Sequence, residues 1–177
     1  RLAIAIEIER AARRDRDVSG VRDLIGCEQS HGVSSAAVAS FGNHPSIWPT
    51  NVDGVLAMAR ALQNRCRLRR FLHLGTAMAC GRQAPALVPE GYDAGDRTEH
   101  FLAYTASKYE AERRLRQELP TLPLVVARPS IVVGHTTLGT LPSPSIFWVF
   151  RMAFALERFT CAPDDQIDVI PVDWCAR

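Results

Sequence analysis

Two side chains that could move a proton, Tyr104 and Lys108, lie four residues apart in the stretch YTASK. On a helix, residues at i and i+4 share one face, so both could reach the same ligand. The pKa of a free tyrosine is about 10, and a nearby ammonium lowers it by stabilising the phenolate. A tyrosine tuned in this way could exchange a proton with a substrate oxygen, which is general acid–base catalysis.

The choice of lysine at position 108 is itself informative. The chain holds 21 lysine plus arginine residues, and Lys108 is the only lysine among them. An ammonium is a compact charge with three rotatable donors, so it can serve a tyrosine and a ligand hydroxyl together, whereas a guanidinium is a rigid planar fork. The same Tyr/Lys spacing also arises by chance in many helices, so the pair alone leaves a purely structural interpretation open.

Two helices are predicted around these residues. From Asn51 an apolar stripe recurs at helical spacing, formed by Val52, Val55, Leu56, Ala59 and Leu62. The segment TASKYEAERRLRQEL predicts a helix over Tyr104–Leu119, in which Glu110 faces Arg113 and Arg114 and which Pro120 and Pro123 close. Between them, the proline- and glycine-containing residues 82–103 predict a long loop.

Short apolar runs predict strands that alternate with these helices. Three segments are near-continuous apolar runs, as in strands buried on both faces: FLHLGT (Phe71–Thr76), PLVVARP followed by SIVVG, and IDVIPV. The stretch SSAAVASFG (Ser34–Gly42) is predicted to be a strand end running into a loop. SIFWVFRMAFALERF is predicted to be a buried core helix, with an acyl-channel wall as the alternative, and Arg1–Arg16 a further helix. The order predicts an α/β fold with a parallel sheet.

Composition narrows the class of protein. A net charge of +2 with interspersed acids argues against nucleic-acid binding, and the basic run RCRLRR is interpreted as the solvated end of a helix rather than a phosphate patch. The apolar run SIFWVF is far too short to span a membrane. The cysteines and histidines show no metal-ligand spacing, so we expect no metal, free thiols and a cytoplasmic protein. They are Cys27, Cys66, Cys80, Cys161, Cys175, His31, His44, His73, His100 and His135.

Several motifs in order resemble the extended short-chain dehydrogenase/reductase superfamily. They are RDVSG, SSAAVASF, NVDGV, HLGTAMACG, YTASKYEAE, VVARPSIVVG and IDVIPVDWCA, and together they cover roughly 17–176. RPSIVVG and VIPVDW resemble the thioester reductase and fatty acyl reductase branch, the male sterility type. The resemblance implies a Rossmann-like, doubly wound parallel sheet, in one NAD(P)-binding domain over 1–177, that binds NADP or NAD.

The resemblance also implies roles for individual residues. Tyr104 would protonate the carbonyl oxygen, Lys108 would lower the pKa of Tyr104 and hold the nicotinamide ribose, and Thr76 would orient the substrate oxygen. Asn51 would support the sheet and a proton-relay water near Lys108. The remaining cofactor contacts would be Asp17 at the adenine, Ala36 and Ala37 where the cofactor approaches the backbone, and Pro129, Ser130 and Ile131 beside the nicotinamide.

Structural alternatives to these roles stay open. Thr76 is also a common strand residue, Asn51 is also a favoured helix cap, and Ser130 could simply bond backbone after a proline. Ser34 stands where the superfamily usually has histidine.

The glycine-rich phosphate loop of such domains, G-x-x-G-x-x-G, is absent from the sequence. We therefore expect that both ends of the chain are cut and that the N-terminal β-α-β portion is missing. The predicted function, for the parent protein, is an NAD(P)-dependent oxidoreductase acting on a small-molecule carbonyl or acyl thioester, with a homodimer as an option. Without the glycine-rich loop, the chain as given is expected to bind the cofactor poorly and to be inactive. A sugar-nucleotide epimerase or dehydratase, or a non-catalytic binding protein of the same fold, are the alternatives.

Overall fold

The computed structural model describes residues 30–85, 87–139, 146–159, 162 and 166–177. The described residues form two compact units, which divide between Arg128 and Pro129. The predicted helix Arg1–Arg16 and the adenine-site candidate Asp17 lie outside the described residues.

Three parallel strands form the sheet of the first unit. They are β1 (Ser30–Ser34), β2 (Leu68–Leu74) and β3 (Leu124–Ala127), in the order β1-β2-β3. The register places Val33 beside Leu72 and Leu72 beside Val125. This confirms the predicted parallel sheet, and the strand predicted at Ser34–Gly42 ends at Ser34.

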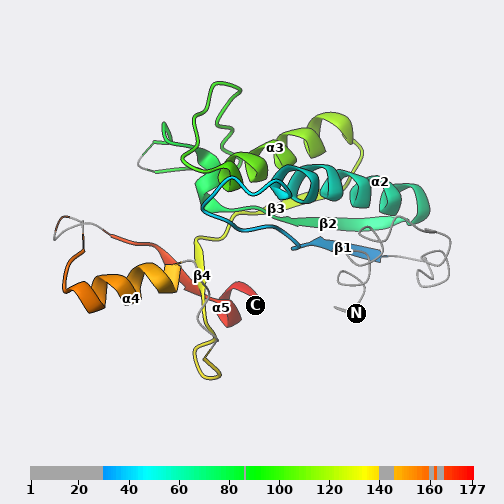
Figure 1. The fold of residues 1–177 in the computed structure, drawn as a ribbon. Coiled ribbons are helices and arrows are strands. Elements are labelled where there is room, and N and C mark those ends of the chain that lie inside the picture. The colour runs from blue at the N-terminus through cyan, green and yellow to red at the C-terminus, as the bar shows by residue number, and fades with distance from the viewer. Residues whose placement is uncertain (1–29, 86, 140–145, 160–161, 163–165) are drawn as a thin grey trace. The chain divides into compact units, whose positions relative to one another are not determined.

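The helices of this unit lie on one face of the sheet (Figure 1). A π-helical turn, η2 (Pro49–Gly54), continues into α2 (Val55–Arg65) between β1 and β2, and α3 (Ala103–Glu118) connects β2 to β3. Both connections join neighbouring parallel strands and step across the sheet in the same direction. Since such crossovers are right-handed, both helices must lie on the same face.

The core lies between this face and the two helices. Four residues of the predicted stripe, Val52, Val55, Leu56 and Ala59, are buried, and Leu62 packs against them. Phe71 of β2 and Ala111 and Leu115 of α3 complete the cluster with Leu122. Burying a side chain of leucine or phenylalanine size contributes roughly 1.5–3 kcal/mol, so this cluster fixes α3 on the sheet.

One local prediction was right only in part. The basic run Arg65–Arg70 begins at a helix end, because α2 ends at Arg65, but β2 already begins at Leu68 and holds the exposed Arg69 and Arg70. Cys66 has an extended backbone (φ −131°, ψ 142°), so the chain leaves the helix there. The strand therefore begins at Leu68, before the apolar run that predicted a strand from Phe71.

The second unit contains a separate two-stranded sheet. The parallel strands β4 (Ile131–Val133) and β5 (Val169–Pro171) pair with each other, and α5 (Val172–Cys175) follows β5. The prediction of a buried core helix at SIFWVFRMAFALERF was wrong: α4 (Ile146–Leu156) has no buried residue, and Phe154 is 87% exposed. The physical reason is that the described part of this unit offers a two-stranded sheet too small to cover an all-round apolar helix. Across the described residues, no helix combines the length and hydrophobicity that a membrane span requires.

Candidate active site

The predicted site residues of the first unit gather where β1 and β2 end. Ala36 and Ala37 follow β1, and Thr76 follows β2 by two residues. Because the carboxyl ends of parallel strands meet at one edge of a sheet, these residues lie at the edge where α/β proteins commonly bind ligands. Ala36 is half-buried and Ala37 is exposed, and their small side chains leave the backbone open to a ligand.

Thr76 begins a short 3-10 helix, η3 (Ala77–Cys80). Its Oγ1 accepts a hydrogen bond of 3.4 Å from the backbone N–H of Met78. The hydroxyl hydrogen of Thr76 is not used in this bond, so the side chain can still donate to a substrate oxygen. This geometry fits the predicted orienting role.

Tyr104 and Lys108 lie in the first two turns of α3, as the spacing predicts. Lys108 is only 2% exposed, and its Nζ donates a 2.8 Å hydrogen bond to the carbonyl of Leu74 at the end of β2. Burial lowers the pKa of Lys108 to about 8, while the carboxylate of Glu112 acts in the opposite direction. The lysine is therefore partly charged at physiological pH.

Tyr104 is half-buried and lies one helical turn before Lys108 on α3. Burial raises the pKa of Tyr104 above its ordinary value, opposite in direction to the lowering expected from Lys108. The reason is that the Lys108 ammonium is directed to the Leu74 carbonyl, and no hydrogen bond among the described residues joins Tyr104 Oη to it. The chain by itself thus holds Tyr104 as the protonated phenol.

Asn51 is completely buried and links two parts of the site. Its Oδ1 accepts from the backbone N–H of Val38 at 2.7 Å, and its Nδ2 donates to the Val38 carbonyl at 3.2 Å and to Ser107 Oγ at 3.0 Å. Asn51 lies inside η2 rather than at a helix cap, so the helix-cap alternative was wrong. Its contacts fix the segment after β1 to α3, next to Lys108.

Pro129, Ser130 and Ile131 belong to the second unit. Ser130 Oγ donates to the backbone carbonyl of Asp168, and Ile131 begins β4 opposite Val169. The backbone contact corresponds to the structural alternative for Ser130. The predicted nicotinamide contacts of these three residues remain a prediction.

Sequence reasoning missed a buried ion pair behind the site. Glu112, one turn after Lys108, is 1% exposed, and Arg128 donates to its Oε2 from Nε at 2.9 Å and from Nη2 at 2.7 Å. The missed signal was the acidic residue at i+4 from Lys108 on the same helix face. The predicted Glu110–Arg113 pair is present at 2.6 Å, whereas Arg114 pairs with Glu118 and Asp53 instead of Glu110.

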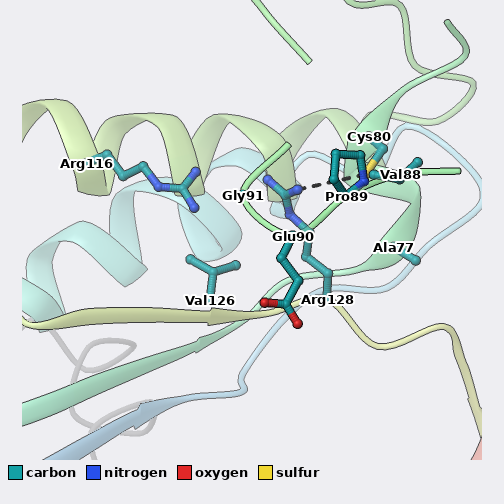
Figure 2. A pocket seen from close by; sticks show the side chains of 9 residues that line it. All are labelled: Ala77, Cys80, Val88, Pro89, Glu90, Gly91, Arg116, Val126 and Arg128. Carbon is teal, nitrogen blue, oxygen red and sulfur yellow. Dashed lines mark hydrogen bonds between the residues drawn. The ribbon is translucent and has the colours of Figure 1, made fainter. Parts of the chain in front are cut away.

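A cavity of about 610 Å³ lies beside α3 and β3 (Figure 2). Thr76, Tyr104 and Lys108 do not line it. The half-buried guanidinium of Arg128, which lines the cavity, is already engaged by Glu112 and by the Tyr92 carbonyl at 2.8 Å, so the charge is compensated. Its lining residues are Ala77, Cys80, Val88, Pro89, Glu90, Gly91, Arg116, Val126 and Arg128.

The residues at the strand ends fit one end of a dinucleotide. The Lys108 ammonium has three N–H groups, and one hydrogen bond to a described residue leaves two for ligand hydroxyls. Lys108, Tyr104 and the backbone at Ala36 and Ala37 could therefore hold a nicotinamide ribose. The sequence lacks the glycine-rich loop that would hold the pyrophosphate.

Solved structures share this architecture. The Bordetella bronchiseptica enzyme WbmG, solved with NAD and UDP, is 26% identical, with a TM-score of 0.59 over 82% of this chain and 44% of its own. The terminal R domain of the myxalamid biosynthetic pathway has a TM-score of 0.73 at 20% identity, over 91% of this chain and 41% of its own. A UDP-N-acetylglucosamine 4-epimerase from Methanobrevibacter ruminantium M1 has a TM-score of 0.66 at 18% identity, over 92% and 52%.

These similarities have a defined extent. The chain spans about half the length of these structures or less. No curated protein matches the sequence. A family model of NAD-binding domains described as "male sterility protein" matches residues 32–177, which is most of the chain. The chain therefore belongs to the male sterility protein family of NAD-binding domains, within the extended short-chain dehydrogenase/reductase superfamily.

Proposed function

We propose that this chain carries the catalytic residues of an NAD(P)-dependent reductase that acts on an acyl thioester or a related carbonyl. The observation that carries the proposal is the hydrogen bond of Lys108, one helical turn after Tyr104, to the Leu74 carbonyl, two residues before Thr76, in a chain of the male sterility family. The fold similarity to the myxalamid R domain supports the reductase branch. The small-molecule substrate and a homodimer are parts of the same proposal.

Each side chain has a chemical task in this reaction. NAD(P)H supplies a hydride when it is bound. Tyr104 is held as the protonated phenol by burial, so it is ready to give its proton to the carbonyl oxygen as negative charge develops there. Thr76 donates a hydrogen bond to the same oxygen and orients it, and Lys108 holds the ribose hydroxyls with its two remaining donors.

The second candidate is a sugar-nucleotide epimerase or dehydratase. It is favoured by the 26% identity to WbmG, which was solved with NAD and UDP. A non-catalytic binding protein is the third candidate, supported by Ser34 in place of the usual histidine. An activity assay distinguishes the three candidates. The reductase would turn over acyl thioesters, the epimerase or dehydratase would turn over UDP-sugars, and the binding protein would turn over neither.

The proposal is tested by NADPH and NADH oxidation with acyl thioesters and aldehydes, in the protein and in Tyr104→Phe. Loss of the general acid is expected to lower kcat about 100-fold or more, while cofactor affinity changes little. Tyr109→Phe is the matched control on the same helix, since its hydroxyl contacts Asp93 at 3.3 Å. Equal kcat in Tyr104→Phe and Tyr109→Phe would contradict the role of Tyr104, and turnover of UDP-sugars alone would establish the second candidate.

A further inference from the structure

Charged residues of alternating sign, Lys108, Glu112 and Arg116, recur every four residues along α3. Residues at this spacing share one helix face, and Lys108 and Glu112 are both almost fully buried. A buried charge is unfavourable unless an opposite charge or hydrogen bonds compensate it. The hydrogen bond of Lys108 goes to a neutral carbonyl, that of Leu74, so its charge needs a further source of compensation.

The carboxylate of Glu112 is held in a fixed place. Arg128 donates two hydrogen bonds to Oε2, and the other oxygen, Oε1, lies directly over Gly75. A Cβ atom on Gly75 would come within 2.3 Å of Oε1, so only glycine leaves room for the carboxylate there. Arg128 also donates to the Tyr92 carbonyl at 2.8 Å, which ties the loop before α3 to the same pair.

One oxygen of this carboxylate remains available to act on its neighbours. Glu112 Oε1 is buried and makes no hydrogen bond within the part of the chain that the structure describes. Its negative charge opposes the effect of burial on Lys108 and raises the pKa of that lysine. Without the carboxylate, burial would act unopposed, and a smaller fraction of Lys108 would be charged near neutral pH.

The other groups around Lys108 do not supply this charge. On α3, Tyr104 is a protonated phenol and Arg116 is a cation. On β2, burial together with Lys108 and Arg116 lowers the pKa of His73 to about 3, so its ring is neutral. Behind Glu112, Arg128 is a further cation. Glu112 is thus the buried anion one helical turn from Lys108 among the described residues.

We propose that Glu112 is a positioning residue for Lys108: its carboxylate, fixed by Arg128 and by its place over Gly75, keeps the lysine charged and on the Leu74 carbonyl. The inference rests on the proposed function in that Lys108 is taken to hold the nicotinamide ribose. It adds a residue pair, Glu112 and Arg128, that touches neither cofactor nor substrate but acts through the lysine.

The single lysine makes a direct test possible. In the 177-residue chain labelled with ¹³C,¹⁵N-lysine, Lys108 gives one side-chain signal, which Lys108→Arg removes and so assigns. Its titration by NMR is expected to have a midpoint near pH 8 in the unchanged protein. Glu112→Gln should lower this midpoint, whereas Glu110→Gln, the same change at the residue paired with Arg113, should leave it in place. An unchanged midpoint in Glu112→Gln overturns the proposal.

A second variant guards against unfolding, because Glu112→Gln leaves the half-buried Arg128 without its anion. Glu112→Gln/Arg128→Met removes both charges, and such replacements of a buried pair commonly leave a protein folded. Circular dichroism should show a folded protein in which the Lys108 midpoint is still below that of the unchanged protein. A midpoint lower by about one pH unit would cut the charged fraction at pH 8 from about one half to about one tenth, a loss of about fivefold in NADH affinity. A folded double variant with unchanged midpoint would show that the pair is merely structural.

The two proposals fail separately in this experiment. If the midpoint falls in the Glu112 variants but the unchanged protein does not bind NADH or NADPH, Glu112 positions Lys108 and the proposed function is wrong. If the unchanged protein binds the cofactor and the variants keep both midpoint and affinity, the function stands and the role of Glu112 is refuted.

Discussion

The lone lysine occupies a place that suits an ammonium better than a guanidinium. Lys108 is a buried residue of α3 and donates a 2.8 Å hydrogen bond to the Leu74 carbonyl at the end of β2. A guanidinium is larger, planar and permanently charged, so it could not fill the same space or lose its charge there. Sequence spacing could predict Tyr104, Lys108 and Thr76 because their chemistry is local to a helix turn and a strand end. It could not predict that burial raises the pKa of Tyr104, because burial depends on residues distant in sequence.

A neighbouring residue, His73, predicts a pH dependence of stability. His73 is fully buried, and its pKa is lowered from 6.5 to about 3. The main cause is burial, and the positive charges of Lys108 and Arg116 act in the same direction. Below pH 6.5 the unfolded chain binds a proton that the folded chain does not bind until about pH 3. The contribution of this group to the free energy of unfolding is therefore present above pH 6.5 and is lost, by about 1.4 kcal/mol per pH unit, as pH falls.

His73→Leu should remove this dependence. Urea unfolding at pH 7 and pH 4 measures it, and the difference between the two pH values should shrink by about 3 kcal/mol in His73→Leu. The same substitution at exposed His31 on β1 is the control. If His73→Leu loses as much stability between pH 7 and pH 4 as the unchanged protein, His73 does not titrate as described.

At the scale of elements, the contact of β2 with α3 positions the site. The order and type of β2, α3 and β3 could be predicted from apolar runs and helical spacing, because each pattern is written within one segment. The close approach of Gly75 to Glu112 joins residues far apart in sequence, and no single segment indicates it. The sequence also misplaced the start of β2. Arg69 and Arg70 are charged and interrupt the apolar pattern expected of a buried strand, yet both lie in β2.

Gly75→Ala tests this contact. The new methyl group would meet Glu112 Oε1 at 2.3 Å, and Arg128 prevents the carboxylate from moving away freely. We expect a loss of about 1–3 kcal/mol in the free energy of unfolding, as for other overpacked sites. Gly42→Ala, where the nearest atom lies at 3.9 Å, should change stability by about 0.5 kcal/mol or less. Equal stability of the two variants in urea unfolding would refute the close packing.

At the scale of the whole molecule, the parallel α/β fold and the superfamily were predictable from motif order. The exposure of α4 could not be predicted from the sequence. The apolar composition of a helix does not tell whether other residues cover it, and the described residues leave α4 without a buried side chain. The match over residues 32–177 agrees with the resemblance carried by SSAAVASF, NVDGV and YTASK. Cofactor binding is the property on which the proposed function depends most.

The most direct measurement is therefore a fluorescence titration of the folded protein with NADPH and NADH, beside Lys108→Arg. We predict saturable binding that weakens as pH rises through about 8, where Lys108 loses its charge. Lys108→Arg should weaken binding about tenfold or more at pH 7, because the charge is kept but its compact geometry is lost. No binding by the folded protein, or equal binding by Lys108→Arg, would contradict the account of this site.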